Sequence, residues 1–221
     1  MGLTYAEENY LKAIIKLVHP PEKTVSTNAL ASHLGTSAPS VTDMLKKLSD
    51  KHLITYERYQ GASLTEEGHR LATSLVRKHR LWEVFLNQSL GMSWDEVHEI
   101  AEELEHIQSP QLIEALDKFL GTPKFDPHGD PIPNAQGKYT LRTQVPLSQL
   151  QVGQSGIVIA VKDDSTSFLQ YLSGKGITLG KSIQILAQDA YDQAITLSVD
   201  ERRTTLAGEV AKNILVKPSA P

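Results

Sequence analysis

The chain has 221 residues, of which 40% are hydrophobic and 22% are charged, and its formal net charge is -4. This length suffices for one large domain or for two to three small ones with packed cores. The absence of cysteine excludes disulfides, zinc-finger thiolates and thiol catalysis. No apolar run approaches the ~20 residues that cross a bilayer, and the N-terminus lacks the hydrophobic block of a signal peptide, so we expect a cytoplasmic protein without a membrane partner. Because the chain is mildly acidic, any nucleic-acid binding must come from a local surface.

The first 74 residues are predicted to form a winged helix-turn-helix domain. A broad apolar stripe over residues 4–18 indicates a first helix. Two shorter helices follow around a turn at Gly35, and the second of them has apolar residues at the spacing of a buried face: Val41, Leu45 and Leu48. Short strands at 53–56 and 62–64 then read as a hairpin, which is the wing.

The second helix of such a motif enters the major groove of DNA with its outer, N-terminal residues toward the bases. Hydroxyl groups can donate to bases or phosphates, small apolar groups can contact a thymine methyl, and lysines suit phosphates. We therefore expect DNA contacts from Ser37, Ala38, Pro39, Ser40, Thr42, Lys46 and Lys47, and from Arg58 on the wing. The alternative is a solvated helix face, which the adjoining wing disfavours.

Two segments between residues 79 and 106 carry imidazole and carboxylate groups at helical spacing. In the first, His79 and Glu83 are four residues apart. The second repeats such groups at spacings of four, three and one: His98, Glu102, Glu105 and His106. These groups lie on one side of the helix, which is separate from its apolar stripe. A ligand set of nitrogen and oxygen atoms that is rich in carboxylates suits a divalent transition metal. A single His/Glu pair is usually solvated, but their convergence favours a metal site.

Residues 75–140 are predicted to form a helical metal-binding and dimerisation domain that ends in a proline-rich connector. A further amphipathic helix covers residues 111–120. Its aliphatic residues, together with the aromatic residues of the preceding helices, exceed what short helices can bury by themselves: Trp82, Phe85 and Trp94. We therefore expect a homodimer, which a reader of palindromic DNA requires.

The C-terminal part of the chain changes to short β-runs. An irregular segment rich in Pro, Gly and Asp over 121–137 precedes it, and His128 and Asp130 in that segment are set aside because isolated loop residues usually bind no metal. Residues 141–221 are predicted to form a small β-barrel without a catalytic motif. The fold class is therefore mainly α with β: a winged helix-turn-helix, a helical dimerisation domain and a barrel.

This order of parts resembles the DtxR/MntR family of metal-dependent transcriptional repressors over essentially the whole chain. The segments that carry the resemblance are SAPSVTDMLKKLSDKHLI, RKHRLWEVFL, VHEIAEELEH and HGDPIP. The resemblance implies a homodimer that binds a palindromic operator in double-stranded DNA when Mn(II) or Fe(II) is bound, and an SH3-like (FeoA-like) C-terminal barrel. It also implies two metal sites, one of His79, Glu83 and His98, and the other of Glu102, Glu105 and His106.

A few positions distinguish the branches of the family. Iron-type members carry Cys where this chain has Glu102, and a hard carboxylate favours Mn(II). The first-helix ligand of the family aligns with Asn9, whose amide oxygen can ligate, whereas Lys12 stands where manganese-type members have a Glu and cannot ligate. The first helix would then couple to metal through Asn9, or through Glu8 after a shift. In the barrel, Asp164 aligns roughly with a family glutamate ligand.

The sequence thus predicts a metal-activated repressor in metal-ion homeostasis. A cation would neutralise the converging carboxylates. It would thereby fix the distance between the recognition helices of the two subunits at one DNA turn, ~34 Å. One alternative is a winged-helix regulator that answers to a non-metal effector. A metal-dependent hydrolase is less favoured, because HExxH is absent and nothing supplies a nucleophile, so we expect no enzymatic activity. A peptide-binding adaptor would need an aromatic groove, which the barrel sequence does not offer.

Overall fold

The computed structural model describes residues 2–18 and 23–219, and the chain divides into two compact units. Unit 1 and unit 2 are each assembled from separate segments of the chain. Unit 1 comprises Met1–His79, Glu102–Pro110 and Pro133–Tyr139, and unit 2 comprises Arg80–Ala101, Gln111–Ile132 and Thr140–Pro221. The three domains predicted from the sequence, with boundaries after residues 74 and 140, stay predictions.

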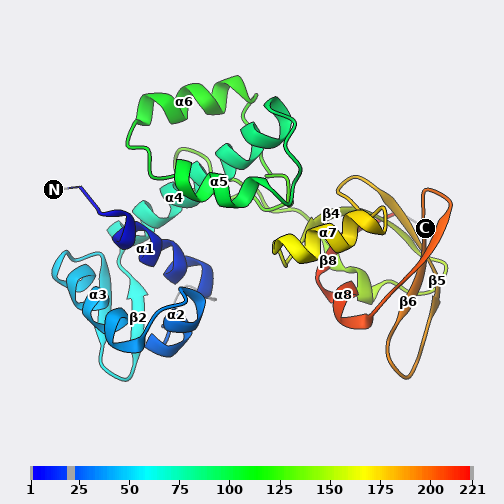
Figure 1. Cartoon of the computed structure of the whole chain (residues 1–221), viewed down its shortest axis with the longest axis horizontal. Coiled ribbons are helices and arrows are strands. Elements are labelled where there is room, and N and C mark those ends of the chain that lie inside the picture. The colour runs from blue at the N-terminus through cyan, green and yellow to red at the C-terminus, as the bar shows by residue number, and fades with distance from the viewer. Residues whose placement is uncertain (1, 19–22, 220–221) are drawn as a thin grey trace. The chain divides into compact units, whose positions relative to one another are not determined.

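Unit 1 contains the predicted winged helix-turn-helix (Figure 1). Its elements are α1 (Tyr5–Leu17), α2 (Thr27–His33), α3 (Ala38–Asp50), β1 (Ile54–Glu57) and β2 (Gly61–Leu64). Gly35 has a φ of +60° in the turn between α2 and α3, a conformation that glycine adopts without steric cost. The strands pair antiparallel and form the wing. The three helices share a fully buried core of Leu11, Ile14, Leu30, Val41, Leu45 and Leu48.

Helix α1 is stabilised by a capping box at its first turn and by an ion pair with the end of α3. Thr4 and Glu7 form a reciprocal capping box at its first turn. Glu7 also pairs with Lys51, which caps the end of α3, at 2.6 Å. Burial alone would raise the pKa of Glu7, but the hydrogen bond and charge of Lys51 lower it. Helix α1 is therefore tied to the predicted recognition helix α3 by an ion pair as well as by apolar packing.

The helices that carry the His and Glu residues follow the wing. They are α4 (Glu66–Val84), the π-helical turn η1 (Phe85–Ser89), α5 (Val97–Leu104) and α6 (Pro110–Phe119). The expectation that one helix runs from His98 to His106 is corrected, because α5 ends at Leu104 and places Glu105 and His106 in the turn after it. The π-helical turn was not predicted either. In unit 2 the Phe85 ring of η1 lies 6.2 Å from the Phe119 ring of α6.

The C-terminal part of unit 2 is the predicted β-barrel, which is coloured yellow to red in Figure 1. Its antiparallel sheet has the strand order β3-β8-β4-β5-β6-β7. The elements are β3 (Val145–Pro146), η2 (Leu147–Gln149), β4 (Ser155–Val161), α7 (Thr166–Gly174), β5 (Ser182–Gln188), β6 (Ile195–Val199), β7 (Arg202–Leu206), α8 (Gly208–Lys212) and β8 (Ile214–Pro218). Among the described residues, no helix combines the length and apolar character that a membrane crossing needs.

The connector packs against the barrel within unit 2. The carbonyl of His128 accepts a hydrogen bond from the Val161 amide at 3.0 Å. The Arg142 guanidinium donates to the carbonyls of Gly129 and Ile159, at 2.5 Å each. The indole N–H of Trp94, a member of the barrel's apolar core, donates to Ser173 Oγ at 2.9 Å. These contacts fix the loop around His128, so its side chains have defined positions.

Candidate metal centres and DNA-binding surface

In unit 1 the turn after α5 faces helix α1. The Glu8 Oε2 and His106 Nδ1 atoms are 2.5 Å apart, and Gln108 donates to Glu8 Oε1 at 2.6 Å. The Tyr5 ring stacks on the His106 imidazole with centroids 4.4 Å apart. Of the two possibilities for α1, the contact with His106 comes from Glu8. The side-chain oxygen of Asn9 is buried without a hydrogen-bond partner among the described residues.

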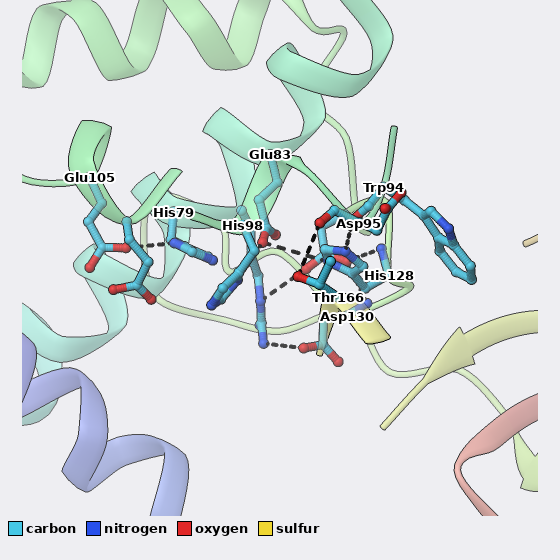
Figure 2. Close-up of polar contacts among 12 residues, drawn as sticks. His79, Glu83, Trp94, Asp95, His98, Glu105, His128, Asp130 and Thr166 are labelled. Carbon is cyan, nitrogen blue, oxygen red and sulfur yellow. Dashed lines mark hydrogen bonds and ion pairs between the residues drawn. The ribbon is translucent and has the colours of Figure 1, made fainter. Parts of the chain in front are cut away.

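The second contact of α1 is made by Lys12, one turn further along the helix. Its ammonium group lies 2.7 Å from Glu102 Oε1, 2.5 Å from Glu105 Oε2 and 3.1 Å from His79 Nδ1. His79 Nδ1 is also 2.7 Å from Glu105 Oε2, and Figure 2 shows these two side chains directed at each other. Ligand atoms of His79, Glu102 and Glu105 all lie within 4.8 Å of one another. We call these three residues the unit 1 cluster.

The unit 1 cluster is largely buried, and carboxylate groups lie close to it. Glu105 is fully buried, and its second oxygen, Oε1, has no hydrogen-bond partner among the described residues. Lys78 is buried as well; burial lowers its pKa, against the opposing charges of Glu8 and Glu105. A buried carboxylate oxygen without a partner is costly, which makes it a candidate for binding a cation.

Unit 2 holds a second group of possible ligands, formed by Glu83, Asp126 and His128. All three are buried, and their ligand atoms lie within 4.8 Å of one another. We call them the unit 2 cluster. The predicted ligand His98 adjoins it, because His98 Nδ1 is 3.2 Å from Glu83 Oε1, while His128 Nδ1 is 3.6 Å from the same oxygen. Figure 2 shows the side chains of Glu83, His98 and His128 near one another.

The electrostatics of the unit 2 cluster depend on burial and on close carboxylates. Burial alone would lower the pKa of His128, but the hydrogen bond and charge of Glu83 and the charge of Asp126 raise it to about 9. Burial, and then the charges of Glu83 and Asp130, raise the pKa of Asp126 to about 7. His128 Nε2 donates to the Trp94 carbonyl at 2.7 Å, which fixes the imidazole ring. The carboxylates of this cluster therefore lie beside two positive charges, the His128 imidazolium and the Arg80 guanidinium, which is 3.3 Å from Asp126 Oδ2.

Part of the unit 2 cluster was not predicted from the sequence. Asp126 was not singled out, and His128 was set aside as an isolated loop residue. The signal that could have found them is their spacing: two ligand-type residues are separated by one proline, in a loop stiffened by further Pro residues. The Asp126 carboxylate also accepts the backbone N–H groups of His128 and Asp130, each at 2.9 Å, and so closes the loop on itself.

The roles of the other predicted metal ligands stay predictions. His79 belongs to unit 1, whereas Glu83 and His98 belong to unit 2, so their grouping into one site stays a prediction. Asp164 is exposed and is in none of the ligand groups found among the described residues. The prediction that it ligates a metal stays untested.

Most of the predicted DNA-contacting residues are exposed on α3 and on the wing. The exposed ones are Ser37, Pro39, Ser40, Lys46, Lys47 and Arg58, while Ala38 and Thr42 are half-buried. Two of the hydroxyls have local partners: Ser37 Oγ caps α3 and lies 2.9 Å from Ser40 Oγ, and Thr42 Oγ1 donates to the Ala38 carbonyl at 3.0 Å. Arg58 stacks over the Tyr59 ring at 4.9 Å. Their role in DNA binding stays a prediction.

Three family descriptions together match nearly the whole chain. The iron dependent repressor N-terminal DNA binding domain matches residues 2–62. The iron dependent repressor metal binding and dimerisation domain matches residues 65–134, and the FeoA domain matches residues 145–218. The matches follow the order of the predicted parts and confirm the predicted fold class, including its FeoA-like barrel.

Individual relatives agree with these matches. The diphtheria toxin repressor of Corynebacterium jeikeium is 33% identical over 129 residues, which are 57% of this chain and 52% of that protein. The iron-dependent repressor IdeR of Mycobacterium bovis is 36% identical over 47% of this chain and 45% of its own length, so the chain spans about half the length of these curated relatives. A solved structure titled as a manganese-dependent transcriptional repressor in complex with manganese is 34% identical, with a TM-score of 0.85 over 96% of this chain and 100% of that one. The chain therefore belongs to the DtxR/MntR family of metal-dependent transcriptional repressors.

Proposed function

We propose that the chain represses genes of metal-ion homeostasis as a homodimer, and that a divalent metal activates its binding to a palindromic operator. The observation that carries this proposal is the position of α1. This helix contacts α5 and the turn after it through Glu8 and Lys12, and it contacts the end of α3 through the 2.6 Å pair of Glu7 and Lys51. A change of charge at the turn can therefore reach the recognition helix through one short helix.

The donor atoms of both clusters support a divalent transition metal. Carboxylate oxygens with imidazole nitrogens are ligands that Mn(II) and Fe(II) accept. Near α1 we propose Glu102, Glu105 and His106 as ligands, with the buried oxygen of Asn9 as a further donor. In unit 2 we propose Glu83, Asp126 and His128, together with the adjoining His98. The positive charge of a bound metal would neutralise these carboxylates.

We propose Mn(II) as the favoured metal, with Fe(II) as the second possibility. The support is Glu102, a hard carboxylate at the position where iron-type members carry Cys. A related solved structure is described as manganese-bound, and others are described with Cd²⁺ and Zn²⁺, so the support from relatives is for a divalent metal in general. We also propose that the chain acts in the cytoplasm, because its proposed ligand is DNA, and that it is not an enzyme.

DNA binding by the chelator-stripped chain tests the proposal. Duplexes selected from a random pool would be titrated with Mn(II), Fe(II), Zn(II) or no metal. Mn(II) or Fe(II) is expected to switch on binding to a palindromic sequence, and Glu102→Ala is expected to remove that response. Equally tight binding without metal would contradict the proposal and favour a regulator with another effector.

Replacing Lys47 with alanine is expected to weaken DNA binding by a similar factor on all sequences. Lys47 is exposed on α3, beyond the residues that face the bases, and is expected to contact a phosphate. Losing one phosphate contact reduces the slope of log affinity against log salt by about 1. Fluorescence anisotropy on the selected operator and on a scrambled duplex over a range of salt measures this. The matched control is Lys16→Ala, which removes an exposed lysine from α1. An unchanged salt slope for Lys47→Ala would exclude the phosphate contact.

A further inference from the structure

We propose that the ammonium group of Lys12 is a tethered cation that occupies the unit 1 cluster and competes with metal for it. The inference rests on the proposed function, because it concerns the metal to which the repressor would respond. Lys12 cannot ligate a metal, but under this proposal it helps to set the metal concentration that activates DNA binding.

The hydrogen-bond geometry of Lys12 is that of a cation surrounded by ligands. Lys12 Nζ donates to one carboxylate oxygen of Glu102 and one of Glu105, and it also lies 3.1 Å from Nδ1 of His79, the third residue of the cluster. The two carboxylates, Glu102 and Glu105, are among the ligands proposed above for a metal near α1. The Lys12 side chain is 5% exposed, so bulk water does not replace these contacts. The aliphatic part of the side chain starts from the buried face of α1 and fixes the charge at the cluster.

The size of the cluster leaves room for one cation. Its three ligand atoms lie within 4.8 Å of one another, a span that metal–ligand distances of about 2.0–2.6 Å fill from a single centre. A metal ion and an ammonium group inside it would be separated by a few ångströms and would repel each other in a buried, weakly screened environment. Metal binding to the cluster therefore requires the Lys12 ammonium group to leave the carboxylates of Glu102 and Glu105.

The charges explain why metal can still displace Lys12. Glu102 and Glu105 bring two negative charges, and the ammonium group returns one. The buried Oε1 of Glu105 stays without a hydrogen bond among the described residues. A divalent ion brings one more positive charge to these two carboxylates than the ammonium group does, in surroundings where Glu8 adds a third carboxylate and Lys78 a second ammonium group. Without metal, Lys12 thus links α1 to α5 and the turn after it by ion pairs. It also raises the metal concentration that is needed to replace its ammonium group at the cluster.

Amine footprinting of the unmodified chain tests the displacement directly. The chain would be treated with an amine-acetylating reagent, with and without Mn(II), and acetylation located by mass spectrometry. Lys12 is expected to be protected without metal and to become reactive when Mn(II) is bound. Lys16, which is exposed one turn further along α1, serves as the control and should react in both states. Equal protection of Lys12 at saturating Mn(II) would overturn the proposal.

Calorimetric titration of Mn(II) into Lys12→Met tests the competition. Methionine keeps the unbranched apolar part of the side chain without its charged end, so the tightest Mn(II) site should gain at least about tenfold in affinity. Lys12→Arg, which keeps the charge, and Lys16→Met should show no such gain. An unchanged or weaker affinity in Lys12→Met would contradict the proposal. If that variant fails to fold without metal, the footprinting of the unmodified chain still decides.

The two experiments separate this inference from the proposed function. If neither the unmodified chain nor Lys12→Met binds Mn(II) or Fe(II), the proposed function and the inference both fail. If the unmodified chain shows metal-dependent DNA binding, while Lys12 stays protected and Lys12→Met binds Mn(II) with unchanged affinity, the proposed function stands and the role of Lys12 is overturned.

Discussion

Replacing His128 with alanine is expected to lower the free energy of unfolding of metal-free unit 2 by about 3 kcal/mol at neutral pH. The variant leaves Glu83 and Asp126 buried within a few ångströms of each other without the imidazolium between them. The raised pKa of His128, about 9, means that this positive charge is present at neutral pH. The variant also removes the hydrogen bond to the Trp94 carbonyl.

Tryptophan fluorescence during urea unfolding measures this effect. The chain has two tryptophans, Trp82 and Trp94, and both belong to unit 2, so the signal reports that unit. The matched control is His98→Ala, which removes another imidazole paired with Glu83. The His98 side chain is 28% exposed, so water can replace it and its loss should cost clearly less. An equal loss of unfolding free energy in both variants would show that burial of the imidazolium does not determine the size of the effect.

The pH dependence of stability gives a second test of the same charge. A group whose pKa is raised on folding stabilises the fold fully below its ordinary pKa, and this contribution is lost as the pH rises through the raised value. For His128 the window lies between 6.5 and about 9. The unmodified metal-free chain should therefore lose stability across this window. His128→Ala should show a flatter profile there, and an identical slope in both proteins would contradict the assignment.

The winged helix could be predicted from the sequence because its determinants are local. The buried face of α3 follows from the spacing of Val41, Leu45 and Leu48, and the turn before it follows from Gly35. Periodicity and turn chemistry act over a few residues, so they can be read without knowing what the helix packs against. The ligand-rich stretch was found in the same way, through helical spacing on α4 and α5.

The pairings inside the clusters could not be predicted, because they join residues far apart in the sequence. Lys12 meets Glu102 and Glu105, which lie 90 and 93 residues away. Lys12 was not expected to ligate a metal, and its position in the sequence gave no indication that its ammonium group lies among the carboxylates. The ligand groups of Asp126 and His128 likewise become visible once the connector loop folds against Glu83. Helical spacing cannot identify partners that come from a loop.

The second large effect is expected from Gly68→Ala, a substitution that helix propensity alone would favour. Gly68 is buried in the first turn of α4, and a Cβ added there would lie 1.8 Å from the Leu53 carbonyl oxygen. That oxygen is fixed by hydrogen bonds from the Thr65 amide, at 3.1 Å, and from Thr65 Oγ1, at 3.0 Å. The clash cannot be relieved by a side-chain rotation, so we expect a loss of about 3 kcal/mol in the stability of unit 1.

Gly174→Ala is the matched control for Gly68→Ala, because Gly174 is also helical but has no atom within 4 Å of the added Cβ. This control should be neutral or stabilising by up to about 1 kcal/mol. Urea unfolding followed by circular dichroism measures both. Leu53 directly precedes β1, so the displaced carbonyl should also move the wing and weaken operator binding by folded Gly68→Ala. Equal stabilities of the two variants would show that α4 is not packed on the Leu53 backbone. Reduced stability with unchanged operator affinity would show instead that the wing does not depend on that contact.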